Sequence, residues 1–299
     1  MLRNKLFDEK TALFLLVLPG ILHLIVFRYV PLFGNVIVFQ EYNLFQGIAG
    51  SPWVGFKHFT AMFSYEEFYH ILRNTLILSL YSLLFGFPAP LLLALLLNEV
   101  RLMWFKRSIQ TLLYLPHFLS WVIVGGIFIN LLSIEGVANT FLGWIGLEKR
   151  DFITMPEYFR PILVFVSIWK EIGWGTIIYL AALAGVNPNL YEAAMVDGAG
   201  RWRQMWNITL PSLLPTIIIL FLLRIGSVLD ANVEQVLIFQ NPLNRDVAEV
   251  IDTYVFRVGL LGSQFSYTTA IGIFQSFVGI VLIFSLNALS RKLTKESIF

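Results

Sequence analysis

The chain has 299 residues, of which 57% are hydrophobic and 13% are charged, and its mean hydropathy is +0.74. Soluble domains are about a quarter charged, so this composition excludes a soluble globular protein and indicates a membrane protein. The formal net charge of +2 gives no reason to expect a nucleic-acid partner, and the lack of cysteine excludes disulfides and thiolate metal sites.

Six apolar segments are long enough to be membrane spans, for which a helix needs about 20 residues. We therefore predict an all-α membrane protein with one membrane domain over 1–299. Its spans are expected at 11–27, 71–97, 109–133, 162–185, 211–230 and 267–290. The first resembles a signal-peptide core, but no small-residue cleavage site follows it, so we expect an uncleaved anchor. The fifth is the weakest of the six predictions, because Arg224 lies near its middle and Asp230 near its end.

The distribution of Lys and Arg predicts the orientation. The segments 1–10, 98–108, 186–210 and 291–299 would lie on one side of the membrane, and their basic residues are about three times as dense as those of the opposite segments. The positive-inside rule makes the denser side cytoplasmic. Both termini and the loop between spans four and five are therefore expected in the cytoplasm.

That loop, 187–211, is a polar and helix-prone segment between two apolar spans. Asn187 can cap a helix and Pro188 suits its first position, so a helix is expected to start there. Gly198 and Gly200 then permit a sharp turn, and a second short helix is expected from about Arg201 to Asn207, ending before Leu210 and Pro211. The result would be a compact, hinged protrusion.

Apolar and basic side chains on the second part of this loop indicate an interface. Trp202, Met205 and Trp206 would be its anchors, with Arg201 and Arg203 beside them; buried aromatic residues with flanking Arg are typical of interface centres. The alternative is an amphipathic connector whose tryptophans rest in the lipid headgroup region.

The loop also carries an ordered motif: Glu192-Ala193-Ala194, then Asp197-Gly198-Ala199, then Ile208, Leu210 and Pro211. This order and spacing resembles the EAA signature of the permeases of binding-protein-dependent ABC importers of type I, the MetI/MalF-like family. In that family the loop docks onto a separate ATPase subunit. The resemblance implies an ATPase-coupling surface made of Glu192, Ala193, Ala194, Asp197, Gly198, Arg201, Trp202, Met205 and Trp206. Glu192 would either hold the turn or meet a basic residue of the ATPase.

Further stretches resemble the sugar-permease branch of this family, and especially the subgroup related to LplB and YtcP. These are Pro52-Trp53-Val54-Gly55-Phe56 with Phe59, Arg73-Asn74-Thr75, Tyr114-Leu115-Pro116, Asn241-Pro242, Asp252-Thr253-Tyr254, and Ser266-Tyr267 with Ala270 and Gly272. The resemblance implies a subunit of the bacterial cytoplasmic (inner) membrane that imports complex saccharides. Its implied partners are a second permease in a heterodimer, two copies of an ABC ATPase and an extracytoplasmic solute-binding protein.

No catalytic or nucleotide signature is present in the chain. The histidines His23, His58, His70 and His117 are scattered without a metal-ligand spacing, and no GxxxxGK[ST] motif for ATP occurs. We therefore expect a non-catalytic subunit without a metal or cofactor of its own, the ATP and Mg being bound by the partner ATPase.

Polar side chains inside spans are costly and usually face a cavity or a partner. The candidates for a saccharide path are Trp169, Lys170, Glu171, Trp174, Arg224, Asp230, Asn232 and Gln235. Aromatic rings and polar groups together suit sugars. If the solute is acidic, such as a uronate oligomer, Arg224 or Lys170 would be its counter-charge. The structural alternatives are that Lys170 and Glu171 neutralise each other and that Arg224 bonds backbone carbonyls.

Two other function classes compete with an ATP-driven permease. An ion-gradient-driven secondary sugar transporter would use Lys170, Glu171, Arg224 and Asp230 as an ion or proton relay, and it predicts inverted repeats, which the sequence does not show. An intramembrane enzyme would need a Ser–Lys or Asp–Asp pair at matched depth, and no pair of this kind is convincing.

Overall fold

The structure is a computed structural model that describes residues 9–294, and the regular elements of this range are helical, with one isolated β-bridge between Gln40 and Trp53. Six stretches are long and apolar enough to cross a membrane, which confirms the predicted all-α fold with six spans. They are Leu13–Phe39, Glu66–Glu99, Trp121–Trp144, Pro156–Ala184, Arg201–Gly226 and Phe265–Lys292.

The chain forms two compact units, 1–65 with 257–273 and 66–256 with 274–299. The single membrane domain over 1–299 stays a prediction. Along the chain, the π-helical η6 (Val255–Leu261) and the long α17 (Phe265–Thr294) run from one unit into the other.

The first unit contains the N-terminal span. Its elements are α1 (Glu9–Leu24), the π-helical η1 (Ile25–Tyr29), α2 (Val30–Gly34), the 3-10 helix η2 (Asn35–Phe39), α3 (Gly47–Gly50) and α4 (Lys57–Ser64). The helical path passes Phe27, where the sequence predicted the first span to end. A π turn carries it past Arg28, and Pro31 follows within the first turn of α2, where a missing N–H is tolerated.

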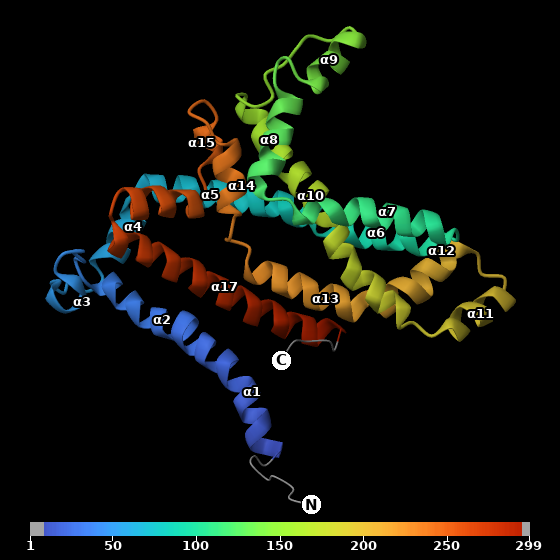
Figure 1. Ribbon diagram of the computed structural model, residues 1–299, viewed down its shortest axis with the longest axis horizontal. Helices are drawn as coiled ribbons and strands as arrows, with labels where there is room; N and C mark the ends of the chain where they lie inside the picture. Colours follow the sequence, from blue (N-terminus) through green and yellow to red (C-terminus); the bar gives the residue numbers. More distant parts are fainter. Residues whose placement is uncertain (1–8, 295–299) are drawn as a thin grey trace, which may run out of the picture. The chain divides into compact units, whose positions relative to one another are not determined.

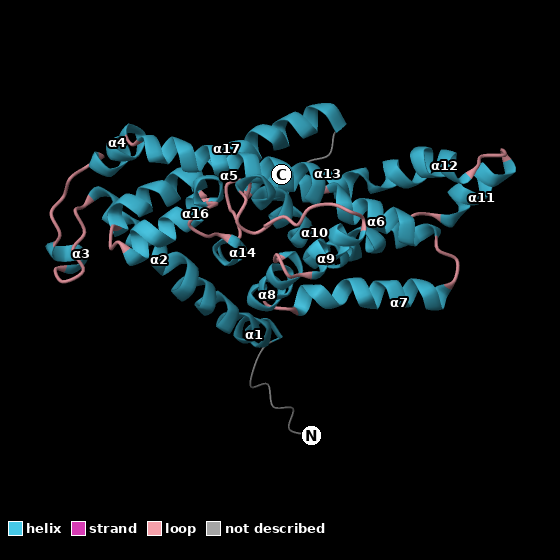
Figure 2. Ribbon diagram, turned by 90° about the horizontal axis from the view of Figure 1, so that it is seen from above, coloured by secondary structure: helices cyan, strands magenta, loops and turns pink. Residues whose placement is uncertain are grey.

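The second unit holds most of the helices. Figure 2 draws the helices in cyan and the loops that join them in pink. They are α5 (Glu66–Tyr81), the π-helical η3 (Ser82–Gly86), α6 (Pro88–Glu99), α7 (Met103–Tyr114), the 3-10 helix η4 (Leu115–Phe118), α8 (Trp121–Leu132), α9 (Val137–Trp144), α10 (Pro156–Ala184), α11 (Pro188–Val196), α12 (Arg201–Gln204), the π-helical η5 (Met205–Thr209), α13 (Leu210–Gly226), α14 (Val233–Phe239), α15 (Arg245–Ala248) and α16 (Ile251–Tyr254). Of these, α11 and α12 lie at one end, beyond α6 and α13 (Figure 1).

Helix α10 organises the second unit because it contributes to two separate hydrophobic clusters. Its first half, with Phe159 and Leu163, packs with residues of α5, α8, α14 and α15. Its last turns, with Tyr179 and Leu183, pack with α6 and α13. The polar side chains Lys170 and Glu171 occur on the stretch of α10 between the two clusters. The polar part of α10 is therefore held between two packed apolar regions.

Small residues allow α10 to approach its neighbours closely. A Cβ on Gly173 would lie 2.1 Å from the carbonyl oxygen of Leu113 in α7, and one on Gly175 would lie 2.9 Å from Cγ of Pro90 in α6. The hydroxyl of Thr176 donates to the carbonyl of Pro90 at 3.1 Å. Glycine contacts of this kind are typical of packed membrane helices.

The third predicted span, 109–133, is not one helix. The chain leaves the α7 helix at Tyr114, makes the 3-10 turn η4 around Pro116, and starts α8 with Ser120 as its N-cap, whose Oγ accepts the N–H of Ile123 at 3.3 Å. The apolar run hides this break because hydropathy does not register a proline followed by a capping serine.

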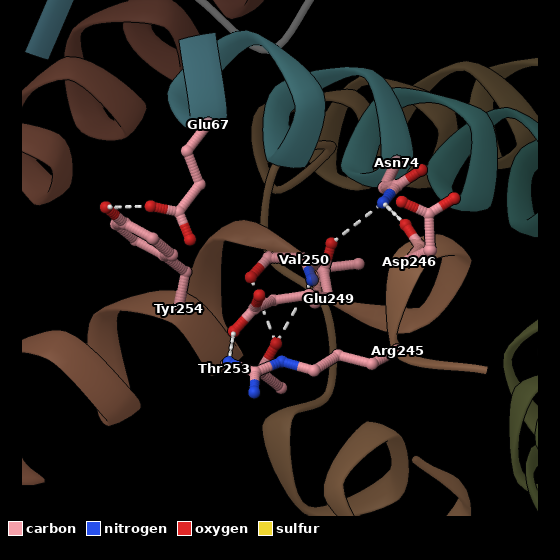
Figure 3. Close-up of polar contacts among 8 residues, drawn as sticks. All are labelled: Glu67, Asn74, Arg245, Asp246, Glu249, Val250, Thr253 and Tyr254. Carbon is pink, nitrogen blue, oxygen red and sulfur yellow. Dashed lines mark hydrogen bonds and ion pairs between the residues drawn. The ribbon is translucent and has the colours of Figure 1, made fainter. Parts of the chain in front are cut away.

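The segment after α14 is fixed to α5 by Asn74 (Figure 3). Its Nδ2 donates to the carbonyls of Asp246 and Glu249 at 2.7 and 3.1 Å, and its Oδ1 accepts from Arg160 at 2.8 Å. The neighbouring Thr75 accepts the N–H of Ile251 at 2.9 Å. Asn74 and Thr75 are buried, so these bonds compensate the cost of burying polar groups.

We predict that Gly173→Ala lowers the stability of the assembled protein. The added methyl group meets backbone, which cannot move aside as a side-chain end can, so a cost of about 1–3 kcal/mol is expected. The measurement is the apparent melting temperature of the purified protein in detergent. Gly126→Ala is the matched control, because no atom lies within 4 Å of its added Cβ. It should be neutral or stabilising, and equal losses in both variants would contradict the packing assigned to Gly173.

Candidate functional site

The loop 187–211 begins as the sequence predicts. Asn187 Oδ1 accepts the N–H of Asn189 at 3.0 Å, and Pro188 occupies the first position of α11. The helix ends at Val196, and Gly198 follows the C-cap Asp197 with a φ of +74° in the left-handed region, where the N–H of Ala199 donates to the carbonyl of Ala194 at 2.8 Å. The predicted helix start and glycine turn are confirmed.

The second part of the loop differs from the prediction. It is not a short helix that ends before Leu210: α12, η5 and α13 form one helical path, Arg201–Gly226. The π turn bonds the N–H of Leu210 to the carbonyl of Met205, and Pro211 follows in the first turn of α13, where it is tolerated. The protrusion is therefore continuous with the fifth span.

The side chains of the predicted coupling surface fall into two groups. Trp202 and Trp206 are 74% and 64% exposed, whereas Met205 packs against the apolar cluster of α6, α10 and α13. The exposed members are Glu192, Ala193, Asp197, Gly198 and Arg201, and Ala194 is partly buried. Within residues 9–294 Glu192 forms no side-chain hydrogen bond or ion pair, so it does not hold the turn.

Two contacts hold the loop together internally, and a third joins it to α6. Tyr191 bonds Thr209 through their hydroxyl oxygens at 3.0 Å, and Gln204 donates to the carbonyl of Ala199 at 2.8 Å. Arg201 lies 3.5 Å from Glu99 at the end of α6. The loop is thus a folded part of the unit that presents two exposed tryptophans.

Two adjoining cavities of about 280 and 340 Å³ lie in the second unit, and they share the wall residues Ser82, Ser167, Glu171 and Arg224. Trp174 lines the first cavity. The predicted path residues Asp230, Asn232 and Gln235 line the second. Six of the eight predicted residues therefore meet at these two cavities, while Trp169 and Lys170 are not among their walls.

Trp169 and Lys170 have structural surroundings instead. Trp169 packs on the first apolar cluster, with its ring 5.2 Å from that of Phe128. Lys170 is 5% exposed, and its Nζ donates to the carbonyl of His117 at 2.7 Å and to Glu171 at 3.2 Å. The pairing of Lys170 with Glu171, which was one of the alternatives from sequence, is present.

His117 is the residue that the sequence did not indicate. Its Nδ1–H donates to Oε2 of Glu171 at 2.7 Å, and its ring stacks on that of Trp174 at a centroid distance of 4.4 Å and an angle of 3°. No spacing rule joins residues more than fifty positions apart on different helices, so only the packing of η4 against α10 brings them together.

The remaining wall residues differ in whether their side chains are held by hydrogen bonds. Asn232 accepts the N–H of Gln235 as the N-cap of α14, and Gln235 donates to the carbonyl of Leu163 at 2.7 Å. Arg224, in contrast, forms no hydrogen bond or ion pair through its side chain within residues 9–294, so the bonds to backbone carbonyls that were one alternative from sequence are not present there. Partial burial raises the pKa of Asp230 above its ordinary value.

The turn that carries Asp230 is held by Asp252 of α16. Asp252 accepts the N–H of Ala231 at 2.6 Å, and Gln275 of α17 donates both to Asp252 at 3.2 Å and to the carbonyl of Leu229 at 3.1 Å. Burial raises the pKa of Asp252, and the hydrogen bonds from Gln275 and Ala231 lower it to a smaller extent. A cavity wall is thus formed by a turn rather than by a continuous helix.

A helical unit with membrane spans, an exposed, folded loop and cavities that charged and aromatic side chains line is compatible with a transport subunit. Residues 86–295 match the family described as binding-protein-dependent transport system inner membrane component. The chain belongs to this family and is a multi-pass permease of the bacterial inner membrane from a sugar ABC importer.

Two curated relatives come from Bacillus subtilis (strain 168). The polygalacturonan/rhamnogalacturonan transport system permease protein YteP is 49% identical over 99% of this chain and 92% of its own, and protein LplB is 49% identical over 96% and 91%. A solved structure of a bacterial alginate ABC transporter, in complex with alginate pentasaccharide-bound periplasmic protein, contains a chain that is 43% identical, with a TM-score of 0.88 over 96% of both chains. The predicted resemblance is confirmed.

We predict that stability falls as the pH rises through the folded-state pKa of Asp252. A carboxyl group whose pKa is higher in the folded than in the unfolded protein binds its proton more tightly when folded, so ionisation above the ordinary value of 3.8 costs stability. The apparent melting temperature should fall less steeply between about pH 4 and 8 in Asp252→Asn. Glu135→Gln, an exposed control, should keep the wild-type slope. The same slope in Asp252→Asn would contradict the assignment.

Proposed function

We propose that the protein is one of two permease subunits of an ATP-driven importer and that its solutes are acidic oligosaccharides. The other proposed partners are two ATPase subunits, which bind the ATP and Mg, and an extracytoplasmic solute-binding protein. Both termini and the loop 187–211 face the cytoplasm in this proposal, in agreement with the density of Lys and Arg.

The observation that carries the acidic solute is Arg224. Its guanidinium group lines both cavities and has no partner within residues 9–294. A charged group in a membrane unit is costly unless something neutralises it, and a uronate carboxylate matches a guanidinium group in two hydrogen bonds. Polygalacturonan, rhamnogalacturonan and alginate, which occur in the names of the similar proteins, are acidic polymers.

The other charges of the cavities are compatible with an acidic solute. Glu171 is neutralised by Lys170 at 3.2 Å, so it acts as a hydrogen-bond acceptor with little net repulsion. Asp230 is the remaining carboxylate of the walls, and its raised pKa weakens its charge at lower pH. The positive charge of Arg224 is therefore the one that an acidic group of the solute would neutralise.

We assign coupling to the ATPase to the protrusion formed by α11, Gly198, α12 and η5. Two exposed tryptophans and a basic residue give it the composition of an interface centre. The protrusion continues directly into α13, which ends two residues after Arg224. A movement of the protrusion can therefore be transmitted along one helical path to the cavity. An ion-gradient-driven sugar transporter is the alternative, and it predicts uptake by this chain alone without ATP.

We predict that Arg224→Gln impairs the transport of acidic saccharides selectively. Arg224 is exposed in this chain, and a bound uronate would form a charge pair with it that the cavity covers. Removal of one partner of a buried, hydrogen-bonded charge pair costs about 2–5 kcal/mol, so the half-saturating concentration for a uronate trisaccharide should rise at least about tenfold. For a neutral trisaccharide it should change less than about twofold. The measurement is ATP-driven uptake into proteoliposomes with the complete complex. Arg107→Gln, an exposed charge outside both cavities, is the control, and an equal loss for both sugars would contradict the assignment.

We predict that Gly198→Val weakens the stimulation of ATP hydrolysis by the solute-loaded binding protein. A β-branched residue at a φ of +74° is strained by about 1–3 kcal/mol, which displaces α12 from α11. ATP hydrolysis stimulated by the loaded binding protein should fall about tenfold. Gly200→Val is the matched control, since its φ of −68° suits any residue and no atom lies within 4 Å of an added Cβ. Normal stimulation in Gly198→Val would refute the coupling role of this turn.

A further inference from the structure

His117 touches two wall residues of the first cavity without lining either cavity itself. Its imidazole ring lies parallel to the indole of Trp174, and its Nδ1–H is bonded to Glu171. One ring therefore contacts both the aromatic group and the carboxylate that face the solute space.

The backbone of His117 is fixed as well. It belongs to η4, the 3-10 turn after Pro116, and its carbonyl oxygen accepts from the buried Nζ of Lys170 at 2.7 Å. Lys170 in turn lies 5.4 Å above the ring centre of Trp121 and is bonded to Glu171. The turn and α10 thus share three contacts through His117, two to its ring and one to its backbone carbonyl, which leaves the imidazole little freedom.

These contacts restrict the two wall side chains. Trp174 is 47% exposed, and the imidazole covers one of its faces, so its ring is supported from behind. Glu171 has its two carboxylate oxygens bonded to different partners, Oε1 to Lys170 and Oε2 to His117. Without His117, Trp174 could rotate about its side-chain bonds and Glu171 would keep one anchor.

We propose that His117 is a positioning residue for saccharide recognition: it holds the indole of Trp174 as a flat platform for the C–H face of a pyranose unit and orients Glu171 to accept hydrogen bonds from hydroxyl groups of that unit. This inference rests on the proposed function and adds the recognition of the sugar ring to that of its carboxylate. Carboxylate oxygens keep lone pairs beyond the two bonds described, so Glu171 can accept further hydroxyl groups.

Different side chains of the first cavity would recognise the carboxylate and the ring of the sugar. Arg224 meets the negative charge, while Trp174 and Glu171 meet the ring, and all three line the first cavity. Binding of a sugar ring costs less conformational entropy when the side chains that contact the ring are already ordered. Loss of His117 should therefore weaken acidic and neutral sugars alike, in contrast to loss of Arg224.

Two variants separate the contacts of His117. His117→Phe keeps a ring against Trp174 but loses the hydrogen bond to Glu171, and His117→Asn keeps a donor for Glu171 but loses the ring. His117→Ala loses both. His70→Asn is the control, because His70 also pairs with a carboxylate, Asp246 at 3.3 Å, outside both cavities.

The experiment measures binding of a galacturonate trisaccharide and a galactose trisaccharide to the assembled, purified complex without ATP, together with ATP-driven uptake. We expect His117→Ala to raise the dissociation constants of both sugars about tenfold, and His117→Phe and His117→Asn to raise them by smaller factors, about two- to fivefold. The maximal uptake rate should remain within about twofold, and His70→Asn should behave as wild type.

Double variants test whether His117 acts through its two neighbours. In the Glu171→Gln background His117→Phe should have no further effect, and in the Trp174→Leu background His117→Asn should have none. Factors that multiply independently in both backgrounds would overturn the proposal, as would wild-type binding by His117→Phe and His117→Asn. If His117→Ala does not assemble into the complex, His117→Phe and His117→Asn provide the test. A wild-type complex that binds and transports no acidic trisaccharide would refute the proposed function instead.

Discussion

An ionised side chain in an apolar helix must be neutralised or must face a cavity, and the second unit satisfies this constraint at one place on α10. Lys170 is buried, and its ammonium group is bonded to a carboxylate and to a backbone carbonyl. Glu171, one position later, points to the cavities from the same part of the helix. The buried cation therefore fixes the carboxylate, and the carboxylate fixes part of the wall on which recognition depends.

The packing of α10 provides the rigidity for this arrangement. One apolar cluster holds the helix before Lys170 and another holds it after Gly175, and the close contacts of Gly173 and Gly175 bring α7 and α6 against the polar part. The turn that carries His117 follows α7 directly, so the position of α7 sets the position of the imidazole. Packing and polar chemistry are parts of one arrangement, since the glycines that allow helices to approach also bring the polar partners within bonding distance.

Some of this could be predicted from the sequence. Length and hydropathy define the six spans, while Asn187, Pro188 and Gly198 define the start and the turn of the loop, because caps and positive-φ positions depend on the residue itself. Hydropathy could not reveal that 109–133 is broken, or that the helix passes Pro211, since a π turn accommodates the proline. The side on which Trp169 and Lys170 lie, and the contacts of His117, depend on neighbouring helices that no local pattern describes.

In the proposed function, a saccharide occupies the space between Trp174 and Arg224 during import. A cryo-electron microscopy map of the complete complex, with a galacturonate trisaccharide and with its ATPases trapped by a non-hydrolysable ATP analogue, tests this most directly. We expect density for a sugar ring against the face of Trp174 that His117 does not cover, with the sugar carboxylate at the guanidinium group of Arg224. A map with well-defined sugar density elsewhere in the permease, and none between these two side chains, would contradict it.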